Sequence, residues 1–317
     1  MGQTFSIVLP FFALIGCGWL AGRRTWLGSG AAEGLTLFVF TFALPALIFR
    51  SAATRPLGEL FEPTYALAYL LAGLFIFGFT AVSGRFLFRL SLAECAVQGQ
   101  AASVGNVGFL ALPLLLAVMG DEAAPPILLG WMIDMIVLVP AAITILEISK
   151  NRGAPGSLST VAAKVIRGVS LNPFVLALTG GIGYGATGLS LPLALDTFTD
   201  LLGRAAGPVA LFALGLTLAG RPLADSLKEA TFLSVIKLLL YPAVMGVAMT
   251  QLFDVPPLWA TAAILLAAAP VAANVYVIAA SYGVYAVRAS SSVLVSTAIA
   301  VVSFSVLTAW MLSGGVP

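Results

Sequence analysis

Long apolar stretches separated by short polar segments run along the whole chain. A membrane-spanning helix needs about 20 predominantly apolar residues, because the hydrocarbon core of a bilayer is about 30 Å thick. Ten segments fit this description, at about residues 4–22, 31–50, 64–88, 93–119, 125–148, 171–189, 202–220, 230–252, 257–281 and 288–313. The pattern therefore predicts an all-α membrane protein with ten transmembrane helices.

The composition also indicates a bilayer environment. Hydrophobic residues make up 60% of the 317 residues and charged residues only 9%, whereas soluble domains carry about 25% charged residues. The net charge of +2 and the lack of a basic run predict no nucleic-acid partner. Histidine is absent and only two cysteines occur, so we expect no metal site and no cofactor.

Basic residues divide unequally between the two faces defined by the predicted spans. Alternate loops place eleven of them on one face and three on the other. The eleven are Arg23, Arg24, Arg85, Arg89, Lys150, Arg152, Lys164, Arg167, Arg221, Lys228 and Arg288, and the three are Arg50, Arg55 and Arg204. Because cytoplasmic loops carry the excess of basic residues, both termini are predicted on the non-cytoplasmic side of a cell membrane.

The ten predicted spans divide into two halves. The longest gap, about residues 150–170, is interpreted as a cytoplasmic linker between residues 1–149 and residues 171–317. Because five is an odd number, the halves have opposite orientations, which is the inverted repeat common among secondary transporters. Three pairs of prolines lie at similar offsets in corresponding spans, namely Pro10 and Pro173, Pro45 and Pro208, and Pro113 and Pro270.

Polar residues and prolines interrupt the fourth and ninth spans. The fourth reads "GQAASVGNVGFLALPLLLAVMG" and the ninth contains "APVAANVYVIAASYG". A proline inside a helix costs about 3 kcal/mol, and in lipid the freed carbonyls must find other partners. Paired interruptions predict a transport site where half-helix N-termini bind an anion such as a carboxylate. In the alternative interpretation, the prolines only kink the helices and the asparagines join neighbouring helices.

The predicted substrate-binding residues are the polar side chains of these two spans. They are Gln100, Ser103, Asn106, Asn274 and Tyr276. The amides of Asn106 and Asn274 would bind the carboxylate, and Pro113 and Pro270 would hold the crossing of the two spans open. A sodium site nearby would use Gln98, Gln100, Ser103 and backbone carbonyls, because such cations prefer oxygen ligands.

Several segments resemble the auxin efflux carrier family of membrane transporters. They are "LFVFTFALPALIF", "GNVGFLALPLL", "NPFVLAL", "LLGRAAGPVALFALGLTLAG" and "APVAANVYVIAASYG". The short linker is similar to that of the bacterial and archaeal members, and the plan is similar to that of bile-acid:sodium symporters. Together the motifs extend over nearly the whole chain.

The resemblance implies a 5+5 inverted repeat in which helices 4 and 9 are broken and cross beside the substrate. It implies a scaffold of helices 1, 2, 6 and 7, a transport bundle of helices 3–5 and 8–10 with elevator-like motion, and a homodimer. Members carry organic anions, which are auxin in plants and dicarboxylates such as malate or malonate in bacteria. By position, Asn106 and Pro113 match one crossing segment, and Pro270 to Tyr276 match the other. Plant members have a second proline near Val275 that this chain lacks.

Two charged residues lie inside predicted spans. They are Asp134 in "GWMIDMIVLVP" and Lys237 in "SVIKLLLYP", and a charge at the bilayer centre costs at least about 2.5 kcal/mol. Three interpretations stay open: the two form a structural pair, Asp134 is a proton or cation coupling site, or Lys237 extends to the membrane surface. Glu94, near the cytoplasmic start of the fourth span, is a further coupling candidate.

Two glycine patterns are interpreted as packing or turn signals. Gly18 and Gly22 form a G-x-x-x-G in the first span, which is typical of close helix packing. Gly183, Gly185 and Gly188 form a G-x-G-x-x-G. A dinucleotide site requires a strand before that motif, but here a predicted membrane helix precedes it.

These features predict a transporter and not an enzyme. The expected substrate is a small organic anion, carried by alternating access with or without H⁺ or Na⁺ as coupling ion; a sodium-coupled symporter of the bile-acid type is the alternative. An intramembrane protease would need a histidine base or a second intramembrane aspartate, and neither occurs. A channel or receptor is the remote alternative, because no ring of like charges lines any span.

Overall fold

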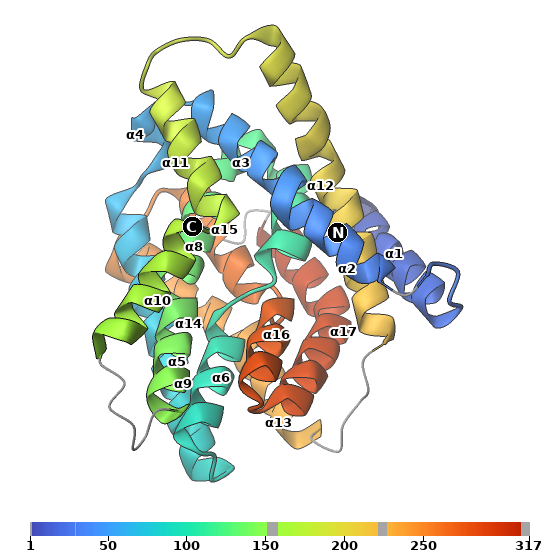
Figure 1. Cartoon of the computed structure of the whole chain (residues 1–317), viewed down its shortest axis with the longest axis vertical. Coiled ribbons are helices and arrows are strands. Elements are labelled where there is room, and N and C mark those ends of the chain that lie inside the picture. The colour runs from blue at the N-terminus through green and yellow to red at the C-terminus, as the bar shows by residue number, and fades with distance from the viewer. Residues whose placement is uncertain (1, 29, 151–157, 221–226, 312–317) are drawn as a thin grey trace.

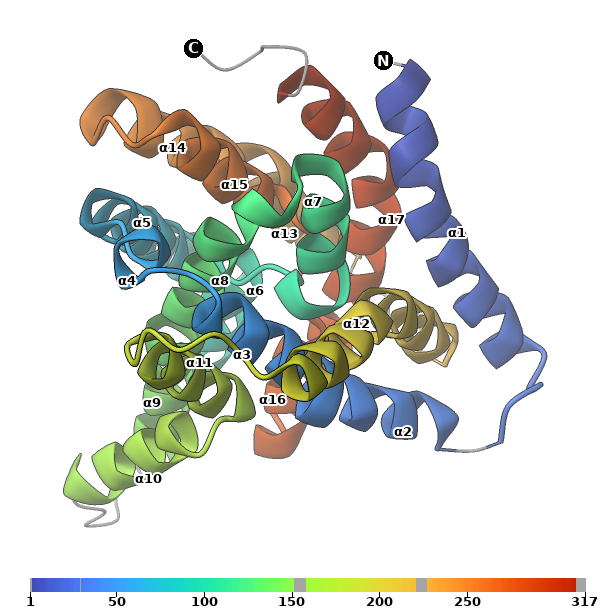
Figure 2. The ribbon, with the colours of Figure 1, turned by 90° about the horizontal axis from the view of Figure 1, so that it is seen from above.

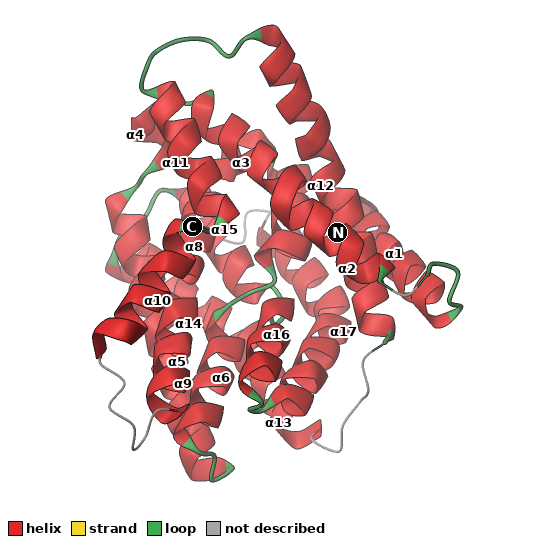
Figure 3. Cartoon of the chain, viewed as in Figure 1, coloured by secondary structure: helices red, strands yellow, loops and turns green. Residues whose placement is uncertain are grey.

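The structure is a computed structural model in which helices are joined by short loops (Figure 1; Figure 3). It describes residues 2–28, 30–150, 158–220 and 227–311. The first helices are α1 (Gly2–Arg23), α2 (Ala31–Phe38), α3 (Leu44–Ala53), α4 (Leu57–Leu60), α5 (Pro63–Leu87), α6 (Leu92–Ser103), α7 (Leu112–Met119), α8 (Ala124–Ile133) and α9 (Val139–Lys150). The others are α10 (Leu158–Ser170), α11 (Pro173–Gly185), α12 (Leu193–Ala219), α13 (Leu227–Val235), α14 (Tyr241–Val247), α15 (Pro257–Ala268), α16 (Ala273–Tyr282) and α17 (Ala286–Trp310).

Six helical segments of the described chain are long and apolar enough to cross a membrane. They are Ala31–Ala53, Gly58–Leu87, Asp121–Lys150, Leu193–Ala219, Leu227–Leu252 and Ala286–Trp310. Shorter apolar helices lie at Leu9–Arg23, Val107–Met119, Pro173–Gly185 and Pro257–Ala268. The six coincide with predicted spans 2, 3, 5, 7, 8 and 10, and the shorter ones with spans 1, 4, 6 and 9. The prediction of an all-α membrane protein is confirmed, whereas ten crossings in a 5+5 repeat stay a prediction.

The helices pack in two groups, which are seen from above in Figure 2. In the first group, α12 packs against α1, α2 and α3, and α11 packs against α3. The second group contains α5, α6, α8, α9 and α13 to α17, in which α5 packs against α6 and α13 against α17. Helix α7 lies between them and contacts α1 and α12 of the first group and α8 of the second.

Four π-helical turns precede prolines in the apolar helices. The turns Val39–Ala43, Val107–Ala111, Asp134–Leu138 and Ile236–Leu240 are each followed two residues later by Pro45, Pro113, Pro140 and Pro242, respectively. Proline lacks an N–H, and its ring clashes with the carbonyl four residues earlier. The wider turn makes room for the ring, so the helix continues through the proline. Such turns are also frequent at functional sites.

The segment interpreted as a linker contains a helix. Helix α10 occupies its second part and contacts α9 and α11. Arg152 and Arg221, which contribute to the predicted orientation, lie outside the described residues. The connection between the two halves of the chain is therefore partly helical.

Helices α1 and α12 approach each other closely at glycines. A Cβ atom at Gly18 would overlap the carbonyl oxygen of Phe212, and one at Gly215 would overlap that of Ile15. A Cβ at Gly22 would lie 2.7 Å from the Cβ of Ala219. The interpretation of Gly18 and Gly22 as a packing motif is therefore confirmed.

We predict that Gly18→Leu lowers the thermal stability of the detergent-solubilised protein, because overpacking a close contact costs about 1–3 kcal/mol or more. Gly16→Leu is the matched control, since no atom lies within 4 Å of a Cβ built at Gly16 in the same helix. The control should unfold at the wild-type temperature or slightly higher, because glycine disfavours a helix by about 1 kcal/mol. Equal effects of the two substitutions would contradict the close α1–α12 contact.

Candidate functional site

The helices of spans 4 and 9 are both broken. Helix α6 ends at Ser103, and the π-helical turn that leads into α7 begins at Val107. Helix α15 ends at Ala268, and α16 begins at Ala273. Each break therefore ends one half-helix and starts another, which frees backbone carbonyls on one side and N–H groups on the other.

The two breaks lie against each other. Gly105 and Val271 form an antiparallel bridge, and the N–H of Asn106 donates a 2.8 Å hydrogen bond to the carbonyl of Pro270. The N–H of Val271 donates to Oγ of Ser296 in α17 at 3.1 Å. The predicted meeting of spans 4 and 9 at their breaks is thus confirmed, and we call residues 104–106 and 269–272 the crossing.

Glycine, and not proline, allows the first break. A Cβ at Gly105 would lie 2.9 Å from the carbonyl oxygen of Leu266 and 3.3 Å from Nζ of Lys237. Pro270 lies inside the second break, as predicted. Pro113 lies in α7, beyond the first break, so the prediction that it forms the crossing is wrong. The π-helical turn before Pro113 accommodates its ring without breaking the helix.

Three amide side chains near the crossing have atoms without a hydrogen-bond partner. Asn106 is 2% exposed with Nδ2 unbonded, Gln100 is fully buried with both amide atoms unbonded, and the half-buried Asn274 has Oδ1 unbonded. An unsatisfied buried polar group costs about 1–3 kcal/mol, so such groups are typical of a binding site. Asn106 precedes the turn that leads into α7, and Asn274 lies in the first turn of α16. Both therefore flank half-helix N-termini.

The other polar residues predicted in these spans are placed differently. Oγ of Ser103 donates to the carbonyl of Gly99 in its own helix at 2.9 Å. Tyr276 is half-buried in α16. Gln98 donates from Nε2 to the hydroxyl of Tyr285 at 3.3 Å, while its Oε1 has no partner. The hydroxyl proton of Ser103 is thus already used within α6.

Lys237 is fully buried and reaches the crossing. Its Nζ donates a 2.8 Å hydrogen bond to the carbonyl of Ala267 at the end of α15 and lies 4.5 Å from the ring centroid of Tyr241. The interpretation of Lys237 as a residue that extends to the membrane surface is wrong, because none of its side chain is exposed. The ammonium instead binds a carbonyl that the break leaves without its helical partner.

Asp134 is also fully buried. The hydroxyl of Tyr69 donates to Oδ2 of Asp134 at 3.5 Å, and Oδ1 has no partner. Lys237 attracts this carboxylate electrostatically, although the ammonium bonds to Ala267 rather than to Asp134. The two charges are therefore coupled without a direct bond. Each lies in one of the π-helical turns.

Three buried tyrosines surround these charges and were not singled out from the sequence. The rings of Tyr65 and Tyr69 in α5 stack with their centroids 5.7 Å apart, and the hydroxyl of Tyr65 donates to the carbonyl of Pro126 at 2.7 Å. Tyr241 lies beneath Lys237. The spacing of Tyr65 and Tyr69 could have indicated that the two rings lie together, because residues four apart lie on one helix face.

Glu94 takes part in interactions that stabilise the start of α6. Its Oε2 accepts from the N–H of Ser91 at 2.8 Å in a capping box, and its Oε1 lies 3.5 Å from Nη1 of Arg288. Arg288 also pairs with Glu229, to which the hydroxyl of Tyr285 donates at 2.7 Å. Burial and this bond raise the pKa of Tyr285 well above its usual value. Both oxygens of Glu94 are used, which favours a structural role over coupling.

Two cavities lie away from the crossing. One of about 670 Å³ is apolar and lies between α14, α15 and α17. The other, of about 650 Å³, lies between α1, α3, α7 and α12 and has charged residues in its lining. Neither is lined by Asn106 or Asn274, so the amides at the crossing do not open into either cavity.

Apolar helices with a buried polar site between two broken helices are typical of a multi-pass membrane protein. Over residues 4–308 the chain matches the family described as membrane transport protein. It therefore belongs to this family, which is the auxin efflux carrier family that its motifs resemble. The family description and the names of its relatives indicate a membrane transporter.

Relatives extend over most or all of the chain. A protein of Rhizobium meliloti (strain 1021) named "Putative malonate transporter" is 33% identical over 320 residues, which cover 100% of this chain and 98% of that protein. "Uncharacterized transporter YfdV" of Escherichia coli (strain K12) is 28% identical and covers 92% and 93%. The "Lysosomal cholesterol signaling protein" of Mus musculus is 26% identical over 273 residues, covering 80% of this chain and 30% of the mouse protein.

We predict that Lys237→Met destabilises the protein more than the double variant Lys237→Met/Asp134→Asn. Removing one partner of a buried charged pair costs about 3–5 kcal/mol, because the other charge is left uncompensated. Neutralising Asp134 as well removes that uncompensated charge. Thermal unfolding of both single variants and the double variant measures the coupling, and strictly additive effects would show that the two charges do not interact.

Proposed function

We propose that this protein is a secondary transporter for a small dicarboxylate, such as malonate, and that it works by alternating access. The substrate binds at the crossing, between Asn106 and Asn274. The observation that carries the proposal is the set of buried amide atoms without hydrogen-bond partners, in Gln100, Asn106 and Asn274, near two half-helix N-termini.

The chemistry of the crossing suits a carboxylate. Half-helix N-termini offer unpaired N–H groups and a partial positive charge, and Nδ2 of Asn106 supplies a further donor. The ammonium of Lys237 lies beside Gly105 and adds a full positive charge near the same place. The relative named as a malonate transporter supports a dicarboxylate as the substrate.

The motion we propose is of the elevator type. The crossing is built from α6, α15, α16 and α17, which all belong to the second helix group. Both sides of the substrate site would then move together, against α1, α2, α3, α11 and α12. Close glycine packing between α1 and α12 supports the first group as the static one.

Coupling to a proton at Asp134 is the mechanism we propose, because this buried carboxylate has an oxygen without a partner and attracts Lys237. Sodium coupling is the second candidate, favoured by the unbonded oxygens of Gln98 and Gln100 near the crossing, since sodium takes oxygen ligands.

We predict that an imposed pH gradient drives malonate uptake into proteoliposomes that contain potassium and no sodium. Asp134→Asn should abolish the response to the gradient because the protonatable group is lost, while the molecules that stay folded should still exchange malonate across the membrane. Radiolabelled malonate measures both activities. Uptake that requires sodium and ignores the pH gradient would support the second candidate instead.

We predict that Asn106→Ala and Asn274→Ala each abolish malonate transport while the protein stays folded and monodisperse. Asn172→Ala is the matched control, since Oδ1 of Asn172 only caps α11 by accepting from the N–H of Phe174 at 2.9 Å. Losing that cap costs about 1 kcal/mol of stability, but transport per folded molecule should be unchanged. Wild-type transport by Asn106→Ala would place the substrate elsewhere.

A further inference from the structure

The three arginines assigned by the sequence to the non-cytoplasmic face line one cleft. The cleft has a volume of about 650 Å³, and Arg50, Arg55 and Arg204 are in its lining. Its walls come from α1, α3, α7 and α12. Pockets for small molecules are usually about 300–1,000 Å³, so a small organic ion fits with room to exchange.

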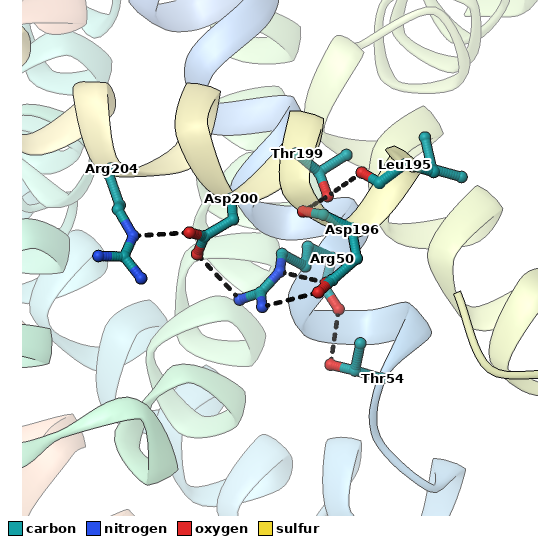
Figure 4. A network of polar contacts seen from close by, with 7 residues as sticks. All are labelled: Arg50, Thr54, Leu195, Asp196, Thr199, Asp200 and Arg204. Carbon is teal, nitrogen blue, oxygen red and sulfur yellow. Dashed lines mark hydrogen bonds and ion pairs between the residues drawn. The ribbon is translucent and has the colours of Figure 1, made fainter. Parts of the chain in front are cut away.

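Arg50 is held in a network of ion pairs that joins α3 to α12 (Figure 4). Its Nε lies 2.7 Å from Oδ1 of Asp196, and its Nη1 lies 3.3 Å from Oδ1 of Asp200. Oδ2 of Asp200 also lies 2.7 Å from Nε of Arg204. The guanidinium of Arg50 is therefore committed to two carboxylates.

Arg55 and Arg204 keep unused hydrogen-bond donors. Arg55 donates from Nη2 to the carbonyl of Asp121 at 2.7 Å, and no carboxylate of the described residues forms an ion pair with it. The side chain of Arg204 is 78% exposed, and its contact with Asp200 uses Nε. A guanidinium has five N–H donors in a fork that matches a carboxylate. Each of these two arginines can therefore still bind one carboxylate.

Part of the lining of the cleft belongs to α7, the helix that follows the crossing. Pro113 of α7 lines the cleft, and a Cβ at Gly207 of α12 would lie 2.8 Å from the Cβ of Pro113. One π-helical turn separates Asn106 from α7. The cleft thus extends from the end of α3 to the helix whose N-terminal side carries Asn106.

We propose that this cleft is a docking site where Arg55 and Arg204 bind the two carboxylates of a soluble dicarboxylate before it reaches the crossing. The inference rests on the proposed function for the substrate class. Asp121, Asp196 and Asp200 also lie in or beside the cleft and balance the three arginines. Such a balance suits weak, exchangeable binding of a free dianion rather than lasting retention of a phosphate headgroup from a lipid.

The test uses a thiol reporter inside the cleft. Thr54 is exposed and lines the cleft, so Thr54→Cys is introduced after Cys17→Ser and Cys95→Ala remove the two native thiols. Proteoliposomes of zwitterionic lipid are treated with anionic, cationic and neutral methanethiosulfonate reagents. The neutral reagent reports whether the thiol is accessible in each variant, and the ratio of anionic to cationic rates reports the local potential.

We expect the double variant Arg55→Gln/Arg204→Gln to lower the ratio of anionic to cationic rates by about tenfold, because charged clefts concentrate counter-ions. The matched control is Arg24→Gln/Lys228→Gln, which removes two exposed basic residues from outside the cleft. The control should keep the wild-type ratio. An unchanged ratio in the arginine double variant overturns the proposal.

Protection of the thiol by malonate identifies the ligand. Malonate should slow the modification of Thr54→Cys, still do so when Asn106→Ala disables the crossing, and fail in the arginine double variant. Loss of the protection by malonate in Asn106→Ala would overturn the assignment of the cleft to a dicarboxylate. Protection of the thiol by phosphatidylglycerol in place of malonate would overturn it as well. If malonate transport depends on Asn106 but the arginine double variant changes neither the modification rates nor the protection by malonate, only this inference fails. If malonate protects the Thr54→Cys thiol but the wild type does not transport malonate, the proposed function fails instead.

Discussion

The structure depends on how backbone groups are satisfied where two membrane helices break. In a bilayer, water is not available to bond a free N–H or carbonyl, and each unsatisfied group costs several kcal/mol. Here the break after α6 and the break after α15 bond to each other, through the N–H of Asn106 and the carbonyl of Pro270. The side chains of Ser296 and Lys237 bind two further backbone groups, the N–H of Val271 and the carbonyl of Ala267. A glycine at position 105 follows from this arrangement, because the two backbones approach too closely for a side chain.

The same constraint explains why a charged lysine is kept deep in an apolar protein. Placing an ammonium at the centre of a membrane helix costs about 2.5–3.5 kcal/mol on insertion scales. The carbonyl of Ala267, the ring of Tyr241 and the attraction of Asp134 offset that cost. The lysine therefore completes the crossing and also brings a positive charge to a place where an anion can bind. A neutral replacement at position 237 would lose the hydrogen bond to Ala267 and, on the proposed function, the positive charge near the substrate.

The sequence was informative where the apolar interior of a bilayer imposes a pattern on many consecutive residues. Apolar runs predicted the helical segments, and the polar interruptions at Asn106 and Asn274 predicted where two of them meet. It was misleading at Pro113, because the chain before a proline can widen into a π-helical turn instead of breaking. One interpretation extended Lys237 to the membrane surface, but its burial depends on which helices pack around that turn. The tyrosines were missed because Tyr65 and Tyr69 read as ordinary residues of an apolar span until Asp134 is seen beside them.

Ligand binding to the purified protein is a direct test of substrate binding at the crossing, since it needs neither a driving force nor a direction of transport. A ligand that binds only the native state raises the unfolding temperature, and about 100 times its dissociation constant adds about 2.7 kcal/mol. The unfolding temperature would be measured against malonate, malate, citrate, indole acetate and a bile acid, in sodium and in potassium. We predict a rise with a dicarboxylate for the wild type and for Asn172→Ala, and a smaller rise for Asn106→Ala, which keeps only the weak binding in the arginine cleft. A rise of the same size in Asn106→Ala would contradict this prediction, because the amide at the crossing would then have no part in binding.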